Sequence, residues 1–290
     1  MKPNLFIVGA PKCGTTSMHS YLGAHPEVQF PVKKEPRYFG RDLHMEGRLS
    51  DSDYMDQFSA IRGVRYTGEA MVYKLFSATA AREIYEMFPE SKIIIILRNP
   101  VDFMYSLYFQ NRYEGIEKAE TFEEALGKEI ELPADPSALK GVIDMPHRLY
   151  YRRNAQFGAQ IQRYFNTFSA ERILVLSFGE FVEKTEDVYQ RTLSFLQLSP
   201  FIPPFSKENA AKRCRASWVR GFMKRPPKSI RVLSSFLLSK ASKKWLNMII
   251  KKANTAPLRK PSLRLDTRRR LETELEPDVQ QIQKLTGLRL

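Results

Sequence analysis

The chain begins with a short apolar segment that runs directly into a glycine-bracketed loop. The sequence predicts a β-strand over residues 5–8, a loop over residues 9–16 (Gly-Ala-Pro-Lys-Cys-Gly-Thr-Thr) and a helix over residues 17–24. The free N–H groups and the dipole of such a helix point at the loop, so an anion binds there favourably. Tight turns of this kind also occur in α/β proteins without a ligand. The segment therefore predicts an α/β fold and, as one interpretation, a phosphate site.

The loop differs from an ATP-binding P-loop in the position of its lysine. A P-loop has lysine directly after its second glycine, followed by a Ser or Thr that holds Mg²⁺. Here Thr15 follows Gly14, and Lys12 stands two residues before that glycine. A lysine at this point can reach a phosphate without a bridging metal. The sequence therefore predicts an anion site that requires no metal ion.

A second buried strand is predicted over residues 92–97, and it ends in Arg98. A nucleotide triphosphatase would have an acidic metal ligand there, whereas arginine can bind a phosphate with two hydrogen bonds. Pro100 is placed to start a helix, which brings Ser106 to its second turn. Arg98 alone would more often be a surface ion-pair partner. Together with the first loop, it indicates a ligand with two separate phosphate groups.

These two motifs resemble those of the sulfotransferases that use 3′-phosphoadenosine 5′-phosphosulfate (PAPS), especially the heparan-sulfate type and related bacterial enzymes. Residues 10–17 resemble the 5′-phosphosulfate loop of that family, and residues 97–106 resemble its 3′-phosphate site. The resemblance covers most of the chain and implies PAPS as the sulfuryl donor. The implied donor-binding residues are Lys12, Cys13, Gly14, Thr15, Thr16, Ser17, Arg98 and Ser106. Lys12 would also stabilise the leaving oxygen.

The base that deprotonates the acceptor is predicted from residues 33–39 (Lys-Lys-Glu-Pro-Arg-Tyr-Phe). This segment resembles the family motif whose glutamate is the base in the heparan N-sulfotransferases, which implies that Glu35 is the base. A glutamate has an ordinary pKa of ~4.3, so burial would have to raise it for efficient proton removal near neutral pH. The alternative is that Glu35 forms a salt bridge with Lys33 or Arg37.

Other positions depart from the resembled family or match it more loosely. His19 could be the base of an aryl-type mechanism, although its helix position fits a core or surface histidine better. Gln110 stands where the N-sulfotransferases have a histidine, and residues 68–73 resemble a family loop with Met-Val in place of Thr-Pro. The region around residue 209 resembles the segment that folds over the nucleotide in bacterial members. The resemblance there implies Lys212 and Arg215 as further donor contacts.

The net charge of +14 is concentrated near the C-terminus. Residues 209–265 contain sixteen Lys or Arg and no Asp or Glu, which leaves the rest of the chain at −2. Such a block can bind nucleic acid, an anionic membrane surface or an acidic polymer. In a PAPS enzyme it would serve an anionic donor or acceptor, and we expect no nucleic-acid partner. Within it, residues 230–252 form a basic amphipathic pattern that either packs on the core or makes peripheral contact with a membrane.

The remaining pattern predicts one α/β domain over residues 1–290, with a P-loop-like parallel sheet flanked by helices and a basic helical C-terminal segment. A third strand is predicted over residues 173–178, and residues 121–144 are the least regular. Further helices are predicted over residues 76–88, 101–113, 148–168 and 266–285, and helical patterns also follow the third strand as far as residue 198. The chain has only two cysteines and begins with a strand, which predicts a cytoplasmic protein. Its aliphatic runs are short, which predicts that it has no membrane span.

The leading hypothesis is a PAPS-dependent sulfotransferase that acts on a hydroxyl or amine of a carbohydrate or small-molecule acceptor. The first alternative is a P-loop kinase of the nucleotide type, against which the positions of Lys12 and Arg98 argue. The second is a non-enzymatic protein that binds a polyanion or a membrane through residues 209–265.

Overall fold

The centre of the molecule is a five-stranded sheet in which all neighbouring strands are parallel, in the order β2-β3-β1-β4-β5. The computed structural model describes residues 1–32, 34–139, 141, 144–205, 212–214, 242, 249, 255–257 and 260–290. The strands of the sheet are β1 (Leu5–Gly9), β2 (Val28–Gln29), β3 (Tyr66–Ala70), β4 (Lys92–Leu97) and β5 (Ile173–Ser177). The predicted α/β class with a parallel sheet is confirmed.

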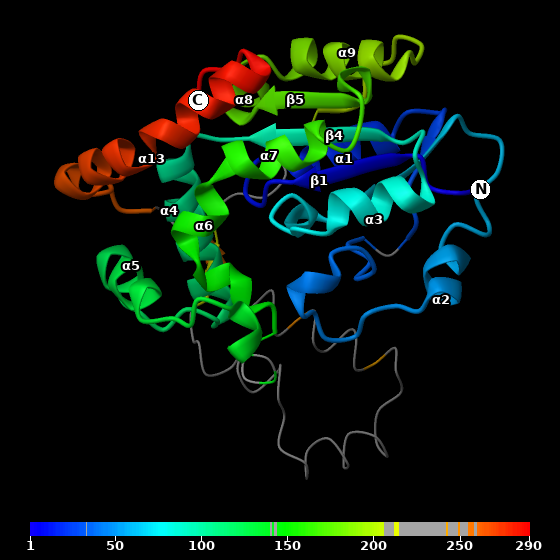
Figure 1. Cartoon of the computed structure of the whole chain (residues 1–290). Coiled ribbons are helices and arrows are strands. Elements are labelled where there is room, and N and C mark those ends of the chain that lie inside the picture. The colour runs from blue at the N-terminus through cyan, green and yellow to red at the C-terminus, as the bar shows by residue number, and fades with distance from the viewer. Residues whose placement is uncertain are drawn as a thin grey trace.

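Helices flank this sheet, as Figure 1 shows. Their bounds are α1 (Thr15–Gly23), α2 (Asp51–Asp56), α3 (Ala80–Met87), α4 (Pro100–Glu114), α5 (Phe122–Ile130), α6 (Tyr151–Ala155), α7 (Phe157–Phe165), α8 (Phe178–Glu183), α9 (Thr185–Leu196) and α13 (Leu265–Thr286). Two further strands, β6 (Lys212–Cys214) and β7 (Thr255–Pro257), pair antiparallel. The amphipathic stretch 230–252 lies almost entirely outside the described residues.

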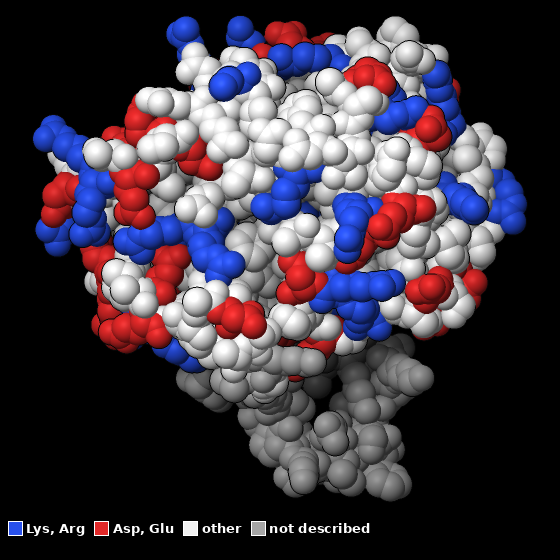
Figure 2. All heavy atoms as spheres, viewed as in Figure 1, with Lys and Arg blue, Asp and Glu red and all other residues white. Residues whose placement is uncertain are grey.

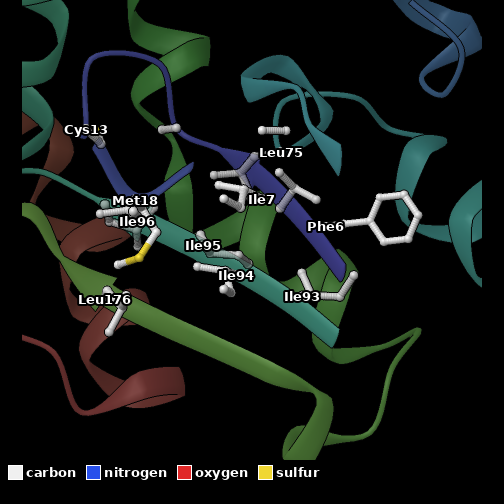
Figure 3. Packing of buried hydrophobic residues seen from close by; sticks show 14 of the residues in the cluster. Phe6, Ile7, Cys13, Met18, Leu75, Ile93, Ile94, Ile95, Ile96 and Leu176 are labelled. Carbon is white, nitrogen blue, oxygen red and sulfur yellow. The ribbon is translucent and has the colours of Figure 1, made fainter. Parts of the chain in front are cut away.

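The core lies around β1 and β4, whose side chains are shown in Figure 3. Residues 93–97 are completely buried, as expected for a central parallel strand that is covered on both faces. β1 and β4 are neighbours in the sheet and run in the same direction. Their carboxyl ends therefore meet at one edge, which brings the loop after β1 close to Arg98 after β4.

Strand β3 was not predicted from the sequence, in which residues 68–73 were compared with a family loop. The segment Tyr66–Ala70 is fully buried and pairs with β1 on one side and β2 on the other. Its polar residues interrupt the apolar pattern that is typical of a buried strand. A buried glutamate is stable there only when it has partners inside the protein. Glu69 has two, the Tyr54 hydroxyl and the Lys74 ammonium.

The predicted long helix over residues 148–168 is wrong, because the chain forms α6 and α7 with a break at Gln156. The Gln160 amide donates to the carbonyls of Arg153 and Asn154 at the end of α6 and satisfies them without a continuous helix. The Asn154 amide donates to the carbonyls of His147 and Tyr150, just before α6. The new helix is capped from a distant element. Asp278 of α13 accepts hydrogen bonds from the N–H of Gly158 at 2.9 and 3.0 Å.

Two further predictions differ from the structure in the residues that they assign to helices. Helix α3 begins at Ala80, four residues later than predicted, because the Ser77 hydroxyl accepts from the N–H groups of Thr79 and Ala80 and forms a separate turn. The segment 121–144 contains helix α5, whose N-cap is Thr121. A threonine three residues before a glutamate is a recognised start signal for a helix, so this helix was predictable.

Lys and Arg side chains are interspersed with Asp and Glu over the described surface seen in Figure 2. This mixture agrees with the near-neutral charge outside residues 209–265. Among the described residues, no helix is both long and apolar enough to cross a membrane.

Candidate active site

The loop between β1 and α1 has the geometry of an anion cradle. Its N-cap is Gly14, which has no side chain to cap the helix, and no acidic residue stands in the first turn of α1. The helix N–H groups and the positive end of the dipole therefore face the loop. Gly14 has a φ of 79°, and a Cβ there would lie 3.1 Å from the rings of Phe178 and Phe181. The left-handed backbone conformation favours glycine, and a Cβ would also be in tight contact with both rings.

The other loop residues differ in their surroundings. Cys13 is completely buried beneath the loop, and burial raises the pKa of its thiol to about 12, so this side chain is a core group. Thr15 is also buried, whereas Thr16 and Ser17 are partly exposed. The Thr16 hydroxyl accepts a hydrogen bond of 2.7 Å from the Lys34 ammonium. Lys34, which the sequence analysis did not select, thus adds a positive charge at the helix start.

Arg98 lies between the end of β4 and the start of α4. The Asn99 side chain caps α4 by accepting from the N–H groups of Val101 and Asp102, both at 3.1 Å, and Pro100 follows at the first helical position. The Arg98 guanidinium lies 5.2 Å from the centre of the Phe178 ring. Because Phe178 also packs close to Gly14, Arg98 and the loop after β1 share one wall.

Ser106 lies two turns into α4, is almost fully buried, and contacts a residue that the sequence analysis missed. The Lys260 ammonium donates a hydrogen bond of 3.1 Å to the Ser106 hydroxyl. Tyr105 fixes the neighbouring backbone by donating to the carbonyl of Pro261 at 3.0 Å. Among the implied C-terminal contacts, Lys212 lies in β6 and Arg215 lies outside the described residues.

The electrostatics of Lys260 show how closely the cations are gathered. Its pKa is lowered to about 8, first by burial and then by the charges of Arg98 and Lys12, while Asp102 opposes this shift. Lys12, Arg98, Ser106 and Lys260 thus lie at one edge of the sheet although they come from three distant parts of the sequence. Cations held this close together in a partly buried place favour a multiply charged anion.

Lys12 is oriented by a chain of polar side chains. Its ammonium donates to Gln110 Oε1 at 3.1 Å, and Gln110 Nε2 donates to Glu114. A carboxylate only accepts, so Glu114 fixes the amide with its oxygen towards Lys12. Arg148 pairs with Glu114 at 2.6 Å. Burial lowers the pKa of Lys12, and the Glu114 carboxylate opposes that shift.

Glu35 lies at the end of β3, where its N–H donates to the carbonyl of Ala70 at 3.2 Å. Its side chain is exposed, which differs from the burial expected of the base from the sequence. Arg37 pairs with Asp144 through two hydrogen bonds of 2.9 and 3.2 Å, so its guanidinium has a different carboxylate partner. Lys33, the other predicted partner of Glu35, lies outside the described residues.

The backbone sets Lys12 and Glu35 apart from most of the chain. Lys12 has a φ of 63° and Glu35 a φ of 60°, both in the left-handed region that residues other than glycine rarely adopt. Strained backbone of this kind is concentrated at functional sites. His44, Met145 and Gln197 share this conformation, so it is compatible with a functional role for Lys12 and Glu35 but does not indicate one by itself.

His19 has the surroundings of a structural residue. Its ring lies 4.1 Å from the ring of Phe30, and burial together with the nearby Lys34 lowers its pKa to about 4. A base with so low a pKa is weak near neutral pH.

Comparisons with known proteins agree with this geometry. The model of the sulfotransferase family matches residues 3–203. Mouse carbohydrate sulfotransferase 15 is 26% identical over 253 residues, covering 68% of this chain and 44% of the relative. The bifunctional heparan sulfate N-deacetylase/N-sulfotransferase 1 of Xenopus tropicalis is 29% identical over 188 residues, covering 60% of this chain and 20% of the relative. The chain thus matches less than half of the length of either curated relative.

A solved structure is similar over the whole chain. The sulfotransferase from Alicyclobacillus acidocaldarius has a TM-score of 0.72 and 27% identity, and the match covers 100% of this chain and 98% of that one. The family match spans both the loop after β1 and the start of α4. The chain therefore belongs to the sulfotransferase family.

Proposed function

We propose that this protein transfers a sulfuryl group from PAPS to a hydroxyl or amine of an acceptor. The observation that carries this proposal is the gathering of Lys12, Arg98, Ser106 and Lys260 where β1 and β4 end. PAPS carries a 5′-phosphosulfate and a separate 3′-phosphate. The loop after β1 fits the first group, and Arg98, Ser106 and Lys260 fit the second. Family membership supports the same reaction class and speaks against the nucleotide-kinase alternative.

The residues have distinct roles in this proposal. When bound, PAPS supplies the sulfuryl group. Lys12 donates a hydrogen bond to the phosphate oxygen from which the sulfur departs and so stabilises the charge that develops there. Glu35 takes the proton of the acceptor as its oxygen or nitrogen bonds to sulfur. The products are the sulfated acceptor and 3′-phosphoadenosine 5′-phosphate (PAP), and the proton remains on Glu35.

We propose a carbohydrate as the first acceptor class to examine, because the relatives include carbohydrate and heparan sulfate sulfotransferases. The residues after β3 differ from the resembled family loop, with Met71 and Val72 in place of Thr-Pro. The panel should therefore also contain small-molecule alcohols and amines.

The proposed reaction is tested by incubating the protein with PAPS labelled with ³⁵S and the acceptor panel. Acceptor-dependent release of PAP together with a labelled product would support it. If PAP is not formed faster than without protein for any acceptor, while PAP itself binds, the proposed acceptor classes are wrong. Failure to bind PAP would contradict the proposal as a whole.

The Glu35→Gln variant is expected to lower kcat about 10²- to 10³-fold, because the amide cannot accept the proton of the acceptor. PAP binding should be unchanged, since Glu35 is not assigned to the donor site. Steady-state kinetics with the best acceptor and a titration with PAP measure the two quantities. Glu46→Gln, a change of the same kind on the exposed surface, is the control. Full activity of Glu35→Gln would mean that another group is the base.

The affinity for PAP is expected to fall as the pH rises above 8. Lys260 has a pKa of about 8 in the free protein, so it is an ammonium at pH 7 and mostly neutral at pH 9. A bound phosphate favours the ammonium, so binding above pH 8 requires uptake of a proton. We expect PAP to bind about tenfold more weakly at pH 9 than at pH 7. Lys260→Gln should flatten this dependence, and an equal slope in both proteins would contradict the assignment.

A further inference from the structure

We propose that Arg268 of α13 is a positioning residue of the donor site. Arg268 binds the Asp102 carboxylate and thereby keeps Arg98 available for the 3′-phosphate of PAPS. This inference rests on the proposed function, because it assumes that Arg98 binds that phosphate. Arg268 lies beyond residue 203, where the match to the family model ends. It would extend the donor site to the C-terminal helix.

The geometry around Asp102 distinguishes its two arginine neighbours. Asp102 Oδ1 accepts from Arg268 Nη2 at 2.6 Å, which is the length of a strong charge-assisted hydrogen bond. Asp102 Oδ2 lies 3.9 Å from Arg98 Nη2, which is too long for a hydrogen bond. The carboxylate is therefore held by Arg268 and is only close to Arg98.

A carboxylate at this position opposes phosphate binding. Asp102 stands in the first turn of α4, where its charge interacts favourably with the helix dipole. The same charge repels a phosphate bound to Arg98 and competes for the guanidinium. Arg268 offsets the charge of the carboxylate, whose other oxygen stays beyond hydrogen-bond distance of Arg98 although still within ion-pair distance. All three side chains are about one third exposed, so solvent weakens these interactions and the effect on binding is moderate.

Helix α13 has several contacts with the rest of the protein besides that of Arg268. It lies beside α4 and α7, as Figure 1 shows. The Thr267 hydroxyl donates to Glu123 at 2.8 Å, and Glu274 pairs with Arg152 at 2.7 Å. Asp278 also caps α7. Loss of the Arg268 side chain should therefore change the charge at Asp102 and leave the helix in place.

The test is a calorimetric titration of PAP into wild type, Arg268→Ala, Asp102→Asn and the double variant. Arg268→Ala is expected to weaken PAP binding about tenfold, because Asp102 is then free to pair with Arg98. Asp102→Asn should bind PAP at least as tightly as wild type, since it removes the repulsive charge. The double variant should recover most of the lost affinity. Arg269→Ala, which removes the same charge from the next, exposed position of α13, is the control and should bind as wild type does.

A purely structural role for Arg268 gives a different result. Asp102→Asn would then weaken binding as much as Arg268→Ala, the double variant would show no recovery, and the inference would be wrong. Adenosine 5′-phosphosulfate, which lacks the 3′-phosphate, is a second probe, and its binding should not change in Arg268→Ala. Equal weakening for both ligands would also contradict the inference. If wild type itself does not bind PAP, the proposed function fails together with the inference.

Discussion

Replacement of Lys12 with alanine is expected to lower kcat about 10²- to 10³-fold, because the variant loses the donor that stabilises charge on the leaving oxygen. The ammonium is held by Gln110, whose amide orientation is fixed by Glu114. This preorganisation makes the hydrogen bond effective at the moment of transfer, since the surroundings need not reorganise. Binding of PAP should weaken much less, because the helix N–H groups, Arg98 and Lys260 remain.

The measurement for Lys12 is a comparison of kcat, the KM for PAPS and the Kd for PAP in the variant and in wild type. Lys2→Ala, which removes the same charge from an exposed position, is the control. A large loss of PAP affinity with an unchanged kcat would show that Lys12 only binds the donor. A kcat within a few-fold of wild type would contradict its proposed catalytic role.

The second large effect is expected on stability, from the ion pair between Glu69 and Lys74. Both side chains are almost completely buried, and the Tyr54 hydroxyl donates to the same carboxylate. Burial lowers the pKa of Lys74 well below its usual range, and the Glu35 and Glu83 carboxylates oppose that shift. The pair is neutral overall wherever its proton lies. Lys74→Met would leave Glu69 buried without this partner and should lower the free energy of unfolding by about 3–5 kcal/mol.

Urea denaturation of Lys74→Met and of the double variant Lys74→Met/Glu69→Leu tests this expectation. The double variant should regain most of the stability, because an apolar pair carries no charge that must be desolvated. Arg82→Met is the control, since it breaks an exposed ion pair with Glu86 and should cost little. A loss below about 1 kcal/mol for Lys74→Met would show that Glu69 is satisfied without the lysine.

The sequence predicted best those parts of the fold that follow from local pattern. The loop after β1 and the strand that ends at Arg98 are short, apolar and punctuated by Gly or Pro, so their elements and their common edge were predictable. β3 was missed because Glu69 and Thr67 interrupt the apolar pattern. The buried charge of Glu69 is satisfied by Tyr54 and Lys74, and strand periodicity does not indicate either contact.

The break between α6 and α7 was missed because it depends on side-chain contacts that the helical periodicity does not indicate. It depends on the side chain of Gln160 and on Asp278, which lies 120 residues after Gly158. The helical periodicity on both sides of Gln156 is unaffected by these contacts. Such a break can be recognised only once the long-range partners are known.

The candidate site shows a similar division. Motifs indicated Lys12, Arg98 and Ser106, and the structure places them together. Lys260 was missed because it lies in a block with many other cations, and its contact with Ser106 is not visible in the sequence. Glu35 stays a prediction, with which its left-handed backbone is compatible, and its charge acts on the pKa of Lys74 and of Tyr73. The single domain over residues 1–290 and the role of residues 209–265 also stay predictions.

Calorimetric titration of PAP into wild type and Arg98→Ala shows whether this edge of the sheet binds PAPS. The titration is done with and without Mg²⁺, with ATP as the comparison ligand. We expect PAP to bind wild type tightly, independently of Mg²⁺ and more tightly than ATP, and we expect this binding to be lost in Arg98→Ala. Absence of PAP binding, or a preference for ATP with Mg²⁺, would mean that this edge is not a PAPS site.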